Sequence, residues 1–186
     1  MPNRGDDRPG IDELDDPEFL DDPDDEYPED ATEDDIDIVC ALYREDGQPL
    51  AVELEVEYAN DLDALIKQLR RIPGEAGALG MISIDSSVFV LVRVRGKKVQ
   101  VYLSDILAAY DWPIARDIAD YLNEELPDED DDSEPIGDAE ILSDVGVSDF
   151  DLENFTADFE EDTLAVVRKI AKRIGYGSQF KKLVPE

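Results

Sequence analysis

The feature that most constrains the fold of this chain is the uneven placement of its negative charge. The formal charge is −33, from 50 acidic and 17 basic residues among 186. Residues 1–35 hold 17 acids and two bases, and residues 124–140 hold ten acids and no base. Segments this acidic repel themselves and bury too little apolar surface to offset the entropy lost on folding. The folded part must therefore come mainly from the rest of the chain.

The charge distribution divides the chain into four predicted parts. We expect a disordered acidic tail over 1–35, an α+β sheet core over 36–123, an acidic linker over 124–138, and a C-terminal helical segment over 139–186 that packs on the core. Outside the two acidic segments the net charge is only −8, and 42% of all residues are hydrophobic. The remainder therefore has the composition of an ordinary globular domain.

Apolar residues alternate with a period of two in five stretches, which predicts five strands. In the first stretch Ile36, Ile38, Cys40 and Leu42 are expected to share one face. Asp46-Gly47 is a strong hairpin signal, and Gly96-Lys97 is a second turn. The predicted strands are residues 36–44, 50–56, 78–84, 88–95 and 98–103.

Helical periodicity appears between the second and third strands and again after the fifth. Asp61 is a plausible N-cap for a helix over 62–71, and Pro113 suits the first turn of a helix over 113–123. Further helices are predicted at 105–109, 139–144, 149–158 and 162–174. The order ββαβββ followed by helices predicts a mostly antiparallel five-stranded sheet in an α+β domain. This element order is roadblock/longin-like, which is an analogy of order alone.

The residue content excludes most catalytic chemistry. The chain has no histidine, so it has no Ser-His or Cys-His pair and no histidine-based zinc site. Cys40 is the single cysteine, and its place in an apolar strand indicates a buried structural thiol. We therefore predict no catalytic residue, no metal site and no cofactor, and do not expect an enzyme.

The first residues of the sequence and the length of its apolar runs indicate where in the cell the protein is expected. Residues 1–7 lack the apolar core of a signal peptide, and no apolar run approaches the roughly 20 residues of a membrane-spanning helix. A cytoplasmic protein is expected. Its negative net charge argues against binding to an anionic membrane surface and against direct binding of nucleic acid.

Two features are candidates for binding a protein partner. The first is a basic cluster on the fourth and fifth strands, whose arginines are expected to share a strand face with two large apolar residues. The alternative is a solvated strand end that neutralises the protein's own acidic segments. The second is Trp112, the only tryptophan. The alternative is that its side chain anchors the apolar core and does not contact a partner. The candidate residues are Phe89, Leu91, Arg93, Arg95, Lys97, Lys98 and Trp112.

Four stretches of the chain resemble the bacterial family of tRNA adenosine deaminase-associated proteins. They are Asp61–Gly80 with its continuation Phe89–Gly96, Ser104–Asp117, Gly137–Gly146 and Ile170–Phe180. The resemblance implies an association with the deaminase that converts the wobble adenosine of tRNA to inosine, and it brings no active-site residues. The zinc signature of the deaminase itself requires histidine, so this chain is not that enzyme.

Three hypotheses follow. The first is a non-enzymatic adaptor that binds a protein partner, with the deaminase or its operon partners as candidates, through the folded core. The second is an acidic nucleic-acid mimic whose acidic segments occupy a basic tRNA-binding groove. The third is an enzyme of unfamiliar type, for which the sequence shows no pocket of buried acids. The oligomeric state stays open.

Overall fold

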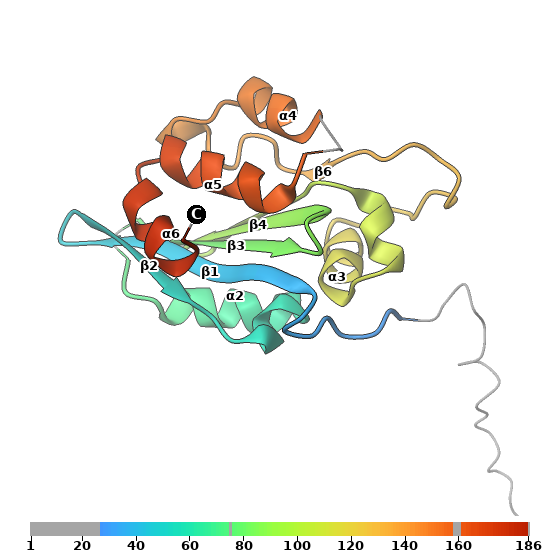
Figure 1. The fold of residues 1–186 in the computed structure, drawn as a ribbon, viewed down its shortest axis with the longest axis horizontal. Helices are drawn as coiled ribbons and strands as arrows, with labels where there is room; N and C mark the ends of the chain where they lie inside the picture. The colour runs from blue at the N-terminus through green and yellow to red at the C-terminus, as the bar shows by residue number, and fades with distance from the viewer. Residues whose placement is uncertain (1–26, 75, 158–160, 186) are drawn as a thin grey trace, which may run out of the picture.

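A six-stranded antiparallel sheet forms the centre of the protein (Figure 1). The computed structural model describes residues 27–74, 76–157 and 161–185. The strands lie in the order β2-β1-β3-β4-β5-β6. Their bounds are β1 Ile36–Glu45, β2 Gln48–Glu53, β3 Ala78–Ile84, β4 Val88–Arg95, β5 Lys98–Leu103 and β6 Ile136–Gly137. The predicted α+β class and antiparallel sheet are confirmed, but the predicted number of strands is one too low.

Helices cover both faces of this sheet. The α-helices are α2 Leu62–Arg71, α3 Pro113–Tyr121, α4 Asp149–Ala157, α5 Thr163–Arg173 and α6 Gly177–Leu183. In Figure 1, α2 lies on one side of the sheet, and α4, α5 and α6 lie on the other. Short 3₁₀ helices η4 Val56–Ala59, η5 Ile106–Tyr110 and η6 Ser143–Val145 complete the described elements. The helix predicted at 139–144 is therefore reduced to turns and the start of η6.

Local sequence signals account for several of these elements. The Ala64 amide N–H donates to Asp61 Oδ1 at 3.1 Å, so Asp61 caps α2 as predicted. Pro113 occupies the first turn of α3, where its missing N–H costs nothing. The second strand ends at Glu53, short of the predicted 56, because the chain turns there into η4.

The sheet separates two apolar cores. The first core lies on the α2 and α3 side and includes Leu65, Leu69, Val90 and Ile114. The second lies on the side of the C-terminal helices and includes Cys40, Leu91, Tyr102, Ile170 and Phe180. Because both faces are buried, β3 and β4 are apolar almost throughout, which explains their near-continuous hydrophobic sequences.

A β-bulge at Asp37 places the side chains of Ile36 and Ile38 on opposite faces of the sheet. Ile36 is opposite Ile84 and Ile38 is opposite Ser83, so one extra residue stands between the two pairs. Ile36 consequently packs against the first core and Ile38 lies in the second, although the alternation predicts one face for both. The Asp37 carboxylate accepts from Ser83 Oγ and from the Ser86 amide, each at 2.8 Å, which holds the bulge in place.

The end of the predicted tail lies on the folded core. Ala31 is buried, and Asn60 holds it by accepting from the Ala31 amide at 2.7 Å and donating to the Ala31 carbonyl at 2.9 Å. Tyr27 Oη donates to Asp117 on α3. The prediction of disorder is therefore wrong for 27–35, because two amide hydrogen bonds and a buried methyl group anchor them. Residues 1–26 lie outside the described part of the chain.

The segment predicted as an acidic linker is attached to the core at both ends. The Tyr110 hydroxyl donates to the Pro127 carbonyl at 2.6 Å, and Leu126 packs against the first core. Ile136 and Gly137 then form β6, opposite Leu103 and Tyr102 of β5. Between these anchors the five acids Asp128–Asp132 are exposed. In the described residues no helix is long and apolar enough to cross a membrane.

Candidate partner-binding site

Two of the predicted partner-binding residues are buried in the second core. Phe89 and Leu91 are 1% and 0% exposed, and the C-terminal helices cover their face of β4. The Phe89 ring packs beside that of Tyr102, with 6.1 Å between the ring centroids. Buried side chains of this kind hold the helices on the sheet, so in this structure neither residue is exposed to a partner.

The two arginines of the predicted cluster are held within the protein. Arg93 is buried, and its guanidinium donates to Asp144 through two bonds of 2.6 and 3.1 Å and to the Ile141 carbonyl at 2.8 Å. Arg95 donates to the same carboxylate at 3.3 Å. The hydrogen bond from Arg93 holds the pKa of Asp144 below its usual range. The structure therefore places these cations in an internal ion-pair network beside η6.

The three remaining candidates lie in two separate places. Lys97 and Lys98 are exposed at the turn between β4 and β5. Trp112 is half-buried before α3 and packs against the first core. The seven predicted residues therefore do not form one continuous surface.

Cys40 lies at the centre of the second core and is completely buried. Burial, with a smaller contribution from the Glu53 charge, raises the pKa of its thiol to about 12. The predicted structural role is confirmed. Since the thiolate is the reactive species, a thiol reagent at pH 8 should label the native protein at least tenfold more slowly than the urea-unfolded protein. Equal rates, followed by absorbance, would show that the thiol is accessible.

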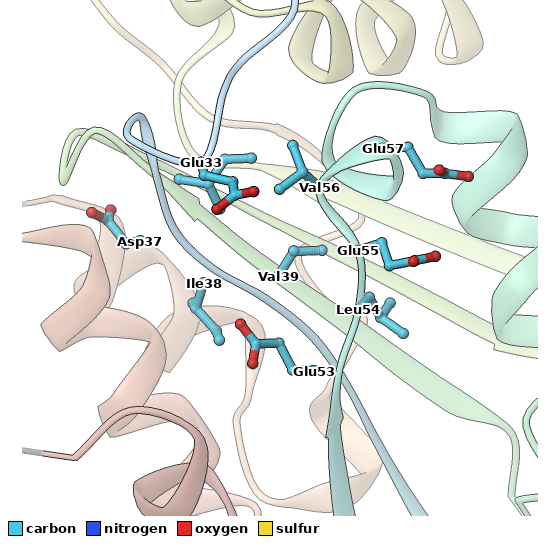
Figure 2. A pocket seen from close by; sticks show the side chains of 10 residues that line it. Glu33, Asp37, Ile38, Val39, Glu53, Leu54, Glu55, Val56 and Glu57 are labelled. Carbon is cyan, nitrogen blue, oxygen red and sulfur yellow. The ribbon is translucent and has the colours of Figure 1, made fainter.

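An acidic groove opens where β2 leaves β1. It has a volume of 470 Å³ and lies between the first residues of β1 and residues 53–57. Figure 2 shows the carboxylates of Glu33 and Glu53 on the β1 side, whereas those of Glu55 and Glu57 point away from β1. All four side chains are exposed. Asp37 also lines the groove, but its carboxylate is engaged in the bulge.

The same groove borders an open edge of the sheet. The register of β2 against β1 ends at Glu53 opposite Cys40, and the Leu54 amide donates to the Val39 carbonyl at 2.9 Å. Within the described residues no strand residue lies opposite Ile36, Asp37 or Ile38 on that side. An open strand edge can accept an extended peptide through main-chain hydrogen bonds. We refer to Glu33, Glu53 and residues 36–38 as the acidic edge.

Sequence reasoning missed the acidic edge for a definite reason. The alternation over 50–57 identifies a wet face with Glu53, Glu55 and Glu57, but it does not show that β2 stops at Glu53. With its open strand backbone and exposed carboxylates, the acidic edge has the groups of a binding surface. Among the residues that the structure describes, no group of three or more histidine, cysteine, aspartate or glutamate side chains is placed to hold a metal ion.

The fold and the groove define an α+β protein with a helix-covered antiparallel sheet and an acidic groove beside an open strand edge. The chain belongs to the family of Rv3753c-like tRNA adenosine deaminase-associated proteins, whose family model matches residues 37–177. The resemblance found in the sequence is thereby confirmed.

One curated relative supports the same assignment. The chain is 27% identical over 147 residues to Protein Rv3753c of Mycobacterium tuberculosis, an alignment that covers 77% of this chain and 85% of that protein. No solved structure matches the chain. The roadblock/longin-like comparison therefore stays an analogy of element order.

Proposed function

We propose that this chain is a non-enzymatic accessory protein of the cytoplasm that binds a protein partner, with the tRNA adenosine deaminase as the first candidate. The family description, which names an association with that deaminase, supports an accessory role. The observation that carries the binding role is the acidic edge, where a stretch of β1 that extends beyond β2 and two exposed carboxylates lie side by side.

The acidic edge suits a basic, extended segment of a partner protein. The Ile36 amide already donates to the Thr32 carbonyl at 3.2 Å, so the remaining backbone groups of residues 36–38 that face away from β3 would supply main-chain hydrogen bonds. Glu33 and Glu53 would pair with lysine or arginine on the added strand. Such an interface requires an extended backbone in the partner and also basic side chains on it. It would therefore retain part of its affinity in high salt, because the main-chain hydrogen bonds are screened little.

The test is binding of the purified protein to the tRNA adenosine deaminase, measured by calorimetry at low and high salt. The variant E33Q/E53Q should bind about tenfold more weakly, since two charge pairs are lost. The matched control is E55Q/E57Q, which makes the same change in net charge at carboxylates that point away from β1. The proposal fails if both variants lose affinity equally or if the wild-type protein does not bind the deaminase.

The nucleic-acid mimic is a second candidate, and the exposed run Asp128–Asp132 favours it. This run projects on a loop at the α3 end of the sheet (Figure 1). A mimic would lose binding when these five acids become Asn or Gln, and its affinity would fall steeply with salt. The same calorimetric series therefore separates the mimic from the adaptor.

A further inference from the structure

The C-terminal helices carry a concentration of positive charge that contrasts with the rest of the protein. Residues 163–185 contain six bases and no acid, within a chain of net charge −33. A groove of 710 Å³ opens on this region. Its lining is Arg168, Lys169, Lys172, Gly175, Gly177, Ser178, Gln179 and Lys181. We call this lining the basic groove.

The turn between α5 and α6 brings the basic side chains of two helices to one place. Lys169 and Lys172 are three residues apart and so lie on one side of α5. Gly175, with a φ of +98°, ends that helix and lets the chain fold back. A Cβ atom at Gly177 would lie only 3.3 Å from Lys172 Cγ, so α6 begins directly against this lysine.

Some of these cations have partners inside the protein, whereas others do not. The Arg168 guanidinium donates to the Val184 carbonyl at 2.7 Å and stacks over the Phe180 ring, and it thereby fastens α6 to α5. Lys169 pairs with Glu161. Among the described residues no ion pair involves Lys172 or Lys181, and both are exposed. The charges of Lys172 and Lys181 are available to a ligand, and Lys169 can exchange its exposed pairing with Glu161 for a phosphate, because such surface pairs contribute little stability.

The surroundings of the groove favour a polyanion over a protein partner. Protein interfaces depend on buried aromatic and large apolar anchors. The aromatic residues of this region, Tyr176 and Phe180, are instead buried in the second core. Interfaces with nucleic acid are more polar and more positive, and lysine, glycine backbone and a serine hydroxyl are groups that contact phosphate.

We propose that the basic groove binds the phosphate backbone of RNA. Without an exposed aromatic platform, recognition is electrostatic and independent of base sequence. This inference is independent of the proposed protein partner. The partner was proposed for the acidic edge on β1 and β2, whereas RNA is proposed for the basic groove on α5 and α6. It is opposed to the expectation, drawn from net charge, that the protein does not contact nucleic acid directly.

The acidic loop that follows α3 does not prevent this contact. In Figure 1 the loop that follows α3 lies at the opposite end of the sheet from α6. At physiological ionic strength charges are screened over about 8 Å, so RNA at the basic groove is little affected by acids at the far end. The separation of charge also orients the protein as it approaches RNA.

The experiment is fluorescence anisotropy of a labelled RNA stem–loop titrated with the full-length protein. Three lysines that neutralise three phosphates should make the affinity fall about 20- to 40-fold between 50 and 200 mM salt. The variant K169Q/K172Q/K181Q should bind at least about tenfold more weakly at 50 mM salt, with a shallower salt dependence.

The matched control is K67Q/R70Q/R71Q, which removes the same charge from exposed positions of α2 and should change affinity less than twofold. Circular dichroism checks that both variants are folded. A polyglutamate peptide of equal charge serves as a competing ligand. The proposal is overturned if polyglutamate binds as tightly as RNA, if both variants weaken RNA binding equally, or if no RNA binding is found at 50 mM salt.

Discussion

Replacing Gly77 with alanine is expected to lower the free energy of unfolding by at least about 3 kcal/mol. Gly77 has a φ of +84°, which alone strains any residue with a side chain. In addition, a Cβ atom here would lie 2.1 Å from the Val94 carbonyl oxygen and 2.7 Å from Arg95 Cγ. Two backbone segments of the sheet would have to separate, which disturbs the pairing of β3 with β4.

Gly96 provides a matched control for this prediction. Its φ is +59°, but nothing lies within 4 Å of the position that a Cβ would occupy. Gly96→Ala should therefore cost only the conformational strain, about 1 kcal/mol. Urea denaturation of both variants measures the difference. Equal losses at the two positions would contradict the close approach of Gly77 to β4.

Replacing Arg93 with alanine is expected to cost about 3 kcal/mol of stability. The substitution removes two hydrogen bonds to Asp144 and leaves the Ile141 carbonyl without its donor. Thermal unfolding followed by circular dichroism should show a Tm lower by about 6–12 °C, given the size of the chain. Lys97→Ala removes the same charge from an exposed turn and should leave Tm within about 2 °C.

The Arg93 prediction also has a pH signature. The pKa of Asp144 is lowered in the folded protein, so its contribution is complete above the unfolded pKa and is lost as pH falls through the folded pKa. The difference in stability between wild type and Arg93→Ala should consequently narrow in acid. A difference that stays constant down to pH 2 would show that the Asp144 carboxylate does not contribute.

Local patterns in the sequence were sufficient for most of the sheet. Alternation located five strands, and Asp61 and Pro113 marked the starts of two helices, because these signals act over a few residues. The missed elements lack such signals. The two residues of β6 lie in an acidic segment without alternation, and α6 begins after Tyr176, whose side chain forms no cap.

The candidate site could not be read from the sequence because it depends on distant partners. Arg93 and Arg95 appeared available, but their partner Asp144 comes about 50 residues later. The bases at 168–173 lie at the end of the helix predicted over 162–174. Their grouping with Lys181 requires α6 to fold back against Lys172, which a single helix pattern does not contain.

The two-sided burial of the sheet has a consequence for how the chain is made. Helix α2 and the adjacent 3₁₀ helix η4 are translated among the strands, so the first core can assemble early. The second core waits for Phe180, which is added 78 residues after Tyr102. At about 5–20 residues per second this interval lasts about 4–16 s. During that time the face with Cys40 and Leu91 is open to chaperones or to neighbouring nascent chains, and α5 and α6 close it as synthesis ends.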